Sequence, residues 1–449
     1  VIETEQENYE SALMLVEKGL VKNSHNIKAR GLKAVLLRKL GRKEEAQQWI
    51  ASNLKVDPFD YLSRFEQAFL SGETGNAEEE RALLKETASL MRADKERYLQ
   101  IARDYAESGM YQEALWTLDQ CGQSYPLLSY YRAYYLLKFG ETDAAREEYA
   151  RADAASPLYC FPNKLEDLIV LENAVRYYPD GAKAYYYLGN LCYDKLQFER
   201  AALLWEKSIE LDGSYPTVHR NLALAYYNKQ GNIEGARREM EKAFALDETD
   251  ARVFLELDQL YKKLDVDFAT RLENYENHPQ LPLERDDVMI EYVTLYNLLG
   301  RHEKAYEVIM SHTFRPWEGA EGKITTQYKV ALTEMAKEQL KKGDAKEALD
   351  LLEKALVYPE NLGEGRLEGT KDNNLYYYLG IAKKALGQNE EAEKAFRVAQ
   401  LGENEPAGMM YYYDQPADMI LYKGLAKEEL GEKKEAYACF YKLLDYGEQ

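Results

Sequence analysis

Apolar residues recur with helical spacing through residues 182–215, and a polar break divides this stretch into two amphipathic segments. After residues 195–197 the spacing restarts with a second apolar stripe, so the pattern predicts two helices joined by a short turn. The small residues Gly189 and Ala201 would let these helices pack closely, with Tyr185 and Trp205 filling the space beside them. The first stripe holds Tyr185, Leu188, Gly189 and Cys192, and the second holds Ala201, Leu204, Trp205, Ser208 and Ile209.

The same unit returns along most of the chain as a glycine, four residues, an alanine, three residues and a large apolar residue. Glycine permits the positive φ angle that closes the turn between two helices, and alanine permits close approach of the second helix. One such hairpin cannot bury its own apolar face, so the hairpins must stack in series. The motif occurs at Gly41/Ala46/Ile50, Gly109/Ala114/Leu118, Gly140/Ala145/Tyr149, Gly231/Ala236/Met240, Gly300/Ala305/Ile309, Gly343/Ala348/Leu352, Gly387/Ala392/Phe396 and Gly431/Ala436/Phe440.

The order of aromatic, Leu-Gly, aromatic and alanine positions in residues 182–215 resembles a tetratricopeptide repeat, a 34-residue helix-turn-helix. Two positions depart from that family, because Cys192 stands where a tyrosine is usual and Leu196 stands where the turn glycine is usual. The resemblance implies an all-α fold, a right-handed tetratricopeptide solenoid of about ten helical hairpins.

Breaks in the repeat pattern divide the chain into four expected blocks. We expect an N-terminal repeat block at 1–157, a single-helix joint bracketed by prolines at 158–181, a regular block at 182–284 and a C-terminal block at 285–449. At the start, residues 9–20 resemble the second helix of a repeat. They would expose Leu13 and Val16 unless something packs on them, so we expect the natural protein to continue upstream.

The C-terminal block departs from the 34-residue period in a regular way. Its turn glycines Gly300, Gly343, Gly387 and Gly431 are 43, 44 and 44 residues apart, so each repeat carries about ten extra residues. The extra residues fall after the second helix, in loops 312–327, 358–374 and 402–416. Equivalent positions of a solenoid stack, so we expect these loops to line up along one edge, where insertions often mark a binding face.

Several phrases of the C-terminal half resemble the repeat region of large bacterial proteins that carry a domain of unknown function called DUF5107. They are LERDD, LYNLLGRHEKA, RPWEGAEGK, YPENLGEGR and DNNLYYYLG, and the resemblance covers roughly residues 157–402. In that family the upstream domain resembles a galactose-mutarotase-type β-sandwich. The resemblance therefore implies carbohydrate chemistry for the full protein. It also makes the protein's own upstream domain an expected partner.

The loops contain residue types that can grip a sugar, because an aromatic ring stacks on C–H groups while carboxylates and amides accept hydroxyl protons. Three roles stay open for them: packing within the loops, docking to the missing domain, and direct contact with carbohydrate. The loop candidates are Trp317, Glu318, Glu321, Lys323, Asn361, Glu364, Arg366 and Asn373, with Asp372 and Tyr411 to Tyr413 beside them.

The first helices of a tetratricopeptide solenoid line its concave side, where members of the family commonly bind peptides. Asn190 and Asn221 resemble two members of the family's carboxylate clamp. Tyr186 replaces the first lysine of that clamp, which argues against it and leaves solvated groove or helix packing as the default roles. The groove candidates are Tyr130, Tyr134, Tyr186, Asn190, Tyr193, Arg220, Asn221, Tyr227 and Arg252.

The composition of the chain excludes some classes of partner and site. With 58 basic against 78 acidic residues the chain carries a net charge of −20, which argues against nucleic acid and anionic membranes. Four scattered cysteines form no metal or disulfide framework and favour a reducing compartment, the cytoplasm. The five histidines lie in different repeats, so no metal site is expected.

Phosphate-binding loops and catalytic serine motifs are also missing from the sequence. We therefore expect a non-catalytic interaction scaffold for proteins or peptides that needs no cofactor. The alternative is a repeat region whose C-terminal loops complete the sugar site of a glycoside-processing enzyme.

Overall fold

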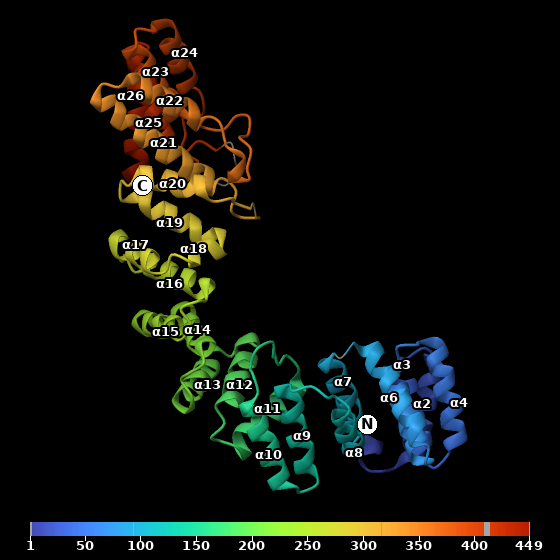
Figure 1. Ribbon diagram of the computed structural model, residues 1–449. Helices are drawn as coiled ribbons and strands as arrows, with labels where there is room; N and C mark the ends of the chain where they lie inside the picture. Colours follow the sequence, from blue (N-terminus) through green and yellow to red (C-terminus); the bar gives the residue numbers. More distant parts are fainter. Residues whose placement is uncertain (1, 93, 316, 408–413, 449) are drawn as a thin grey trace. The chain divides into compact units, whose positions relative to one another are not determined.

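The computed structural model describes residues 2–92, 94–315, 317–407 and 414–448. Across these ranges the chain forms helices, turns and loops but no β-strand. Figure 1 shows consecutive helices running as antiparallel neighbours. The all-α fold of stacked helical hairpins is therefore confirmed. None of the helices in the described ranges is both long and apolar enough to cross a membrane.

The chain divides into two compact units, residues 1–246 and 247–449. The four blocks expected from the sequence are finer than this division and stay a prediction. The first unit contains α1 (Ile2–Glu5), α2 (Tyr9–Lys22), α3 (Ile27–Lys39), α4 (Lys43–Val56), α5 (Tyr61–Glu73), α6 (Ala77–Met91), α7 (Lys95–Ala106), α8 (Tyr111–Asp119), α9 (Pro126–Lys138), α10 (Thr142–Ala154), α11 (Leu165–Tyr177), α12 (Ala182–Asp194), α13 (Phe198–Leu211), α14 (Pro216–Ala225), the π-helix η1 (Tyr226–Gln230) and α15 (Ile233–Leu246).

The second unit continues the same pairing of helices, with longer connections between its last four hairpins. It contains α16 (Ala251–Lys263), α17 (Phe268–Asn277), α18 (Leu281–Glu284), α19 (Asp286–Leu298), α20 (His302–Ser311), α21 (Lys323–Lys342), α22 (Ala345–Ala355), the 3₁₀ turn η2 (Glu360–Leu362), α23 (Asn373–Ala385), α24 (Asn389–Ala399), α25 (Ala417–Glu429) and α26 (Lys433–Glu448).

The turn and contact positions of the repeated motif behave as the sequence predicts. All eight turn glycines have positive φ angles, between 64° and 85°. Leu196, which replaces the glycine in the 182–215 repeat, has a φ of 62° and so adopts the left-handed conformation that the turn requires. The eight alanines that follow are at most 2% exposed, so each second helix lies against its partner.

One part of the 182–215 interpretation needs correction. Tyr186, expected to line an open groove, is 6% exposed, while Tyr185, expected in the core, is only partly buried. The reason is that α12 packs against helices on two sides. The Tyr187 ring lies 6.0 Å from Tyr130 of α9, and the Tyr186 ring lies 5.1 Å from Tyr215, which precedes α14.

The N-terminal helices are also better covered than the sequence indicates. Leu13 of α2 is 3% exposed and belongs to the core of the first unit, while Val16 is partly buried. Glu5 of α1 lies against Gly109, in the turn between α7 and α8, so closely that a Cβ atom on the glycine would meet the Glu5 Cα at 2.9 Å. Chain more than 100 residues away in sequence therefore covers this end.

Candidate functional site

Asn361 ties the first two long loops of the second unit together. Its amide Nδ2 donates to the carbonyl oxygens of Ile309 and His312, both at 2.8 Å. Its own carbonyl accepts from the backbone N–H of Phe314 at 2.8 Å. These three bonds place loop 358–374 beside loop 312–327, which agrees with the stacking expected from their spacing.

Charged residues strengthen the same edge. Glu364 accepts a hydrogen bond from the Gly322 N–H at 2.9 Å. Asp372, 3% exposed, accepts two bonds from Arg366 at 2.8 and 3.1 Å and one from Lys329 at 2.7 Å. The guanidinium of Arg366 and the carboxylates of Glu364 and Asp372 therefore already have hydrogen-bond partners within the protein.

Asn373 extends the edge toward the third loop. Its amide donates to the carbonyl oxygens of Ala399 and Leu401 at 2.6 and 2.8 Å, and the Gln415 side chain donates to its oxygen at 3.3 Å. Asn373 thus holds the chain on both sides of residues 408–413. Tyr411 to Tyr413 lie outside the described residues.

The remaining loop candidates lie at the surface. Trp317 is 37% exposed, and Glu318, Glu321 and Lys323 are exposed as well. Glu321 accepts from the Gly319 N–H at 2.8 Å, within its own turn. A binding role for these four residues stays a prediction.

The groove candidates separate into one cluster and several scattered residues. In the cluster, the Asn190 oxygen of α12 accepts from Trp205 Nε1 at 3.0 Å and from Asn221 Nδ2 of α14 at 3.1 Å, and Arg220 donates to the Asn221 oxygen at 3.5 Å. The Tyr193 ring lies 5.4 Å from Trp205. This network belongs to the contact between two neighbouring repeats.

Other groove candidates lie elsewhere. Tyr130 is 1% exposed and belongs to the core rather than a surface, because it packs between Tyr149 of α10 and Tyr187 of α12. The Tyr134 ring faces the ammonium group of Lys138 at 4.7 Å. Tyr227 lies in η1, and Arg252, which pairs with Glu256 at 3.3 Å, belongs to the second unit.

The first unit contains a cleft that the sequence did not reveal. It has a volume of about 390 Å³ and opens between α7, the start of α9 and the loop that leads into α11. The loop supplies aromatic and basic side chains, and α7 supplies polar ones. The lining residues are Glu96, Gln100, Arg103, Tyr125, Tyr159, Phe161, Asn163 and Lys164.

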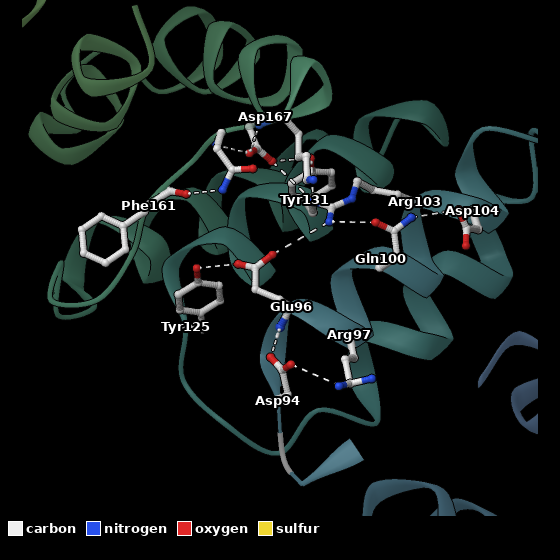
Figure 2. A network of polar contacts seen from close by, with 12 residues as sticks. Asp94, Glu96, Arg97, Gln100, Arg103, Asp104, Tyr125, Tyr131, Phe161 and Asp167 are labelled. Atoms are coloured by element: carbon white, nitrogen blue, oxygen red, sulfur yellow. Dashed lines mark hydrogen bonds and ion pairs between the residues drawn. The ribbon is translucent and has the colours of Figure 1, made fainter. Parts of the chain in front are cut away.

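Arg103 of α7 is the central charge of this cleft (Figure 2). Its guanidinium lies 3.4 Å from the Tyr131 hydroxyl, 3.5 Å from the Gln100 oxygen, 3.5 Å from Asp167 and 3.9 Å from Glu96. Burial by itself would lower the pKa of Arg103, but Tyr131, Asp167 and Glu96 raise it above its ordinary value. The side chain therefore stays cationic although it is only 5% exposed.

Asp167 fixes the loop above the cleft, as Figure 2 shows. One of its oxygens accepts from the backbone N–H groups of Asn163 and Lys164 at 2.8 and 2.9 Å, and the other accepts from the Tyr131 hydroxyl at 2.6 Å. Glu96 accepts from the Tyr125 hydroxyl at 2.7 Å on the opposite side. The walls of the cleft are therefore positioned by internal hydrogen bonds.

The segment that leads into α11 carries large, strongly exposed apolar side chains, and two of them, Tyr159 and Phe161, line the cleft. Leu158, Tyr159, Phe161 and Leu165 are 63%, 83%, 68% and 71% exposed, and Tyr159 adopts a φ of 58°. Large exposed apolar side chains that are bordered by polar groups typically mark an interaction surface. The sequence signal was the phrase LYCFPNKL, whose apolar residues cannot all face a core because proline interrupts the helix.

The described residues contain no group of three or more His, Cys, Asp or Glu side chains that could hold a metal ion. All four cysteines are free and buried. Burial raises the pKa of Cys160, beside Tyr125 and Tyr187, to about 11, so this thiol stays protonated near neutral pH.

Comparison with known families identifies one part of the first unit. Residues 170–216, which span most of α11 and the α12–α13 hairpin, match the model of the tetratricopeptide repeat family. Over this stretch the chain is therefore similar to a tetratricopeptide repeat. The glycine turns and buried alanines of the other hairpins give them the helix-turn-helix form of this repeat.

Three solved structures illustrate the proteins to which the chain is similar. MamA from Desulfovibrio magneticus is 20% identical over 43% of this chain and 97% of its own, with a TM-score of 0.26. YrrB, a tetratricopeptide protein with an unusual peptide-binding site, is 16% identical over 54% of this chain and 97% of its own, with a TM-score of 0.21. A tetratricopeptide protein from Parabacteroides merdae is 15% identical over 68% and 99%, with a TM-score of 0.29.

Proposed function

We propose that this protein is a non-catalytic interaction scaffold that binds an extended segment of another protein in the cleft of its first unit. The observation that carries this proposal is the cleft itself, with exposed Tyr159 and Phe161 at its rim and Arg103 in its floor. Apolar rings provide contact area, and a few fixed polar groups provide orientation, which is the usual composition of a binding site.

Rigidity of the walls supports the same function. The loop is held by the bonds from Asn163 and Lys164 to Asp167, so little ordering would be needed when a ligand binds. A site that is already ordered loses less conformational entropy on association.

The partner proposed from sequence resemblance is the protein's own upstream domain, in a bacterial, carbohydrate-related protein of the cytoplasm. The loop edge of the second unit favours docking over direct contact with sugar. Asn361, Glu364 and Arg366 already bond within the protein, and a sugar hydroxyl would have to displace those bonds. Trp317, Glu318, Glu321 and Lys323 are left as the surface that could meet a partner.

The proposed function can be tested with a phage-displayed library of random 12-residue peptides, selected on the full chain. Selected peptides are synthesised and titrated against the native protein and the Tyr159→Ala and Phe161→Ala variants. We expect each variant to weaken binding about tenfold or more, because each removes exposed ring area from the contact.

Leu203→Ala is the matched control, since Leu203 is 65% exposed on α13 and lies outside the cleft. It should leave affinity unchanged. Selection of no binders, or equal loss of affinity in all three variants, would refute a peptide site in this cleft.

A further inference from the structure

The chemistry of the cleft points to one class of ligand. We infer that it binds an extended protein segment that carries an acidic side chain beside a large aromatic one. This inference rests on the proposed function and adds to it the identity of the two side chains that the cleft recognises.

The first reason is the weak coordination of Arg103. A guanidinium has five N–H donors, and charge-assisted bonds to a carboxylate usually measure about 2.7–2.9 Å. The four neighbours of Arg103 lie at 3.4 to 3.9 Å, longer than that range. A ligand carboxylate entering the cleft would give this buried cation the short, paired bonds that its own neighbours do not supply.

The neighbouring acids are already occupied. Asp167 accepts from Tyr131, Asn163 and Lys164 at 2.6 to 2.9 Å, and Glu96 accepts from Tyr125 at 2.7 Å. These donors fix both carboxylates in place and help to offset their charge. Neither acid can move toward Arg103 without losing a shorter bond.

Local charge opposes an acidic ligand less in the cleft than elsewhere on the chain. The cations Arg103 and Lys164 balance Glu96 and the adjacent Asp167, whereas the whole chain carries a charge of −20. No described acidic side chain forms an ion pair with the Lys164 ammonium group, which is exposed at the rim. The cleft is thus a site where an acidic segment would find cations on a protein that otherwise repels it.

The aromatic half of the ligand follows from the rim. Tyr159 and Phe161 stand on either side of Cys160 in the chain and are 83% and 68% exposed, although the short loop that carries them is pinned by Asp167. Tyr159 also adopts the left-handed region at a φ of 58°, a conformation that costs free energy for a non-glycine residue. A second aromatic ring packed on this pair would cover the exposed area and give favourable ring–ring contact.

The test uses four synthetic 12-residue peptides of Gly and Ser with one central pair: Phe-Glu, Phe-Gln, Phe-Lys or Ala-Glu. Both ends are capped by acetyl and amide groups, so that only the side chain carries charge. Affinity for the full chain is measured by titration at low and high salt. We expect Phe-Glu to bind about tenfold more tightly than Phe-Gln or Ala-Glu, Phe-Lys to bind most weakly, and high salt to reduce the Glu preference.

Two variants test which cations of the cleft recognise the acidic side chain of the peptide. Arg103→Met should abolish the difference between Phe-Glu and Phe-Gln, and circular dichroism checks that the variant is folded. Lys164→Ala keeps the buried network and should reduce the preference about threefold. Lys346→Ala, an exposed lysine on α22 of the second unit, is the control and should leave the preference unchanged.

The outcomes separate this inference from the proposed function. Equal binding of Phe-Glu and Phe-Gln that still weakens in Phe161→Ala would refute the acidic preference and leave the peptide site standing. A Glu preference that persists in both Arg103→Met and Lys164→Ala would also overturn the inference. So would failure of all four peptides under conditions where library-selected peptides bind.

Discussion

A small set of glycines determines how closely the helices of a hairpin approach. Gly189, Gly380 and Gly424 each face an aromatic ring of the following helix, namely Trp205, Phe396 and Phe440 in that order. A Cβ atom built on these glycines would lie 2.5, 2.4 and 2.4 Å from the ring. Real Cβ atoms do not approach so closely, so any side chain at these positions must push the ring away.

We predict that Gly189→Ala destabilises the α12–α13 hairpin by about 1–3 kcal/mol, because the added methyl group overpacks the contact with Trp205. Native-state hydrogen exchange of the amides of α12 and α13 measures this local change. Gly19→Ala is the control, since nothing lies within 4 Å of a Cβ atom there. In the interior of α2 it should instead stabilise by about 0.5–1 kcal/mol. Equal effects of the two changes would argue against the overpacking explanation.

The conformation or burial of a residue could be predicted from the sequence where it depends on a single hairpin. The positive φ of the turn glycines and the burial of the alanines follow from the hairpin alone. The tyrosines at 185–187 could not be assigned, because α12 packs against both α9 and the segment before α14. With two neighbours the buried face is wider than the single stripe assumed for an amphipathic helix.

At the scale of elements, the long loops of the second unit act as connectors between hairpins. Loop spacing predicted that equivalent loops would stack, and the bonds of Asn361 show the first two side by side. The sequence could not show which polar residues would make those bonds. The residues that bind a glycan and the residues that hold loops together are drawn from the same types, Asn, Glu and Trp, so composition does not distinguish the two roles.

We predict that Asn361→Ala loosens loop 312–327, because it leaves the carbonyl oxygens of Ile309 and His312 without their amide donor. The local cost should be about 1–3 kcal/mol, seen as faster hydrogen exchange at Phe314 and its neighbours. Glu360→Ala changes the adjacent exposed residue and should leave exchange in that loop unaltered. Unchanged exchange in Asn361→Ala would show that packing, rather than these bonds, holds the loop.

The cleft illustrates why a site can escape sequence analysis. Arg103 lies on α7, Tyr125 precedes α9 and Lys164 precedes α11, and each segment alone shows only an ordinary mixture of polar and apolar residues. Only the stacking of successive hairpins brings these segments together. The apolar loop 158–165 was visible in the sequence, but the sequence did not show that Cys160 would be buried while Tyr159 and Phe161 would be exposed.

At the scale of the whole molecule, a buried ionic network joins distant parts of the first unit. Arg38 of α3 contacts both oxygens of Glu66 of α5 at 2.8 and 3.1 Å and Glu113 of α8 at 3.0 Å. Lys39 also pairs with Glu113, and the Tyr105 hydroxyl donates to Glu66 at 2.6 Å. Arg38, Glu66 and Glu113 are each at most 5% exposed, so three hairpins depend on charges hidden from water.

This network should make the first unit sensitive to acid. Burial by itself raises the pKa of Glu113, but the bonds and charges of Lys39 and Arg38 outweigh it and leave the pKa below the ordinary value of 4.5. A carboxyl whose pKa is depressed by folding stabilises the folded state above its unfolded pKa. That stabilisation is lost as pH falls through the folded pKa.

We therefore predict that the first unit loses stability below about pH 4.5, and that Glu113→Gln reduces this loss. Near neutral pH the same variant should cost about 1.5–3 kcal/mol, because Arg38 and Lys39 lose a charged partner. Hydrogen exchange of α3, α5 and α8 between pH 3.5 and 7, corrected for the intrinsic exchange rate at each pH, measures both effects.

Glu45→Gln is the control. It removes the exposed partner of Arg42 and should change neither measurement noticeably, because surface pairs contribute little. If Glu113→Gln left the acid dependence of these helices intact, the prediction would be wrong and another group would have to carry that dependence.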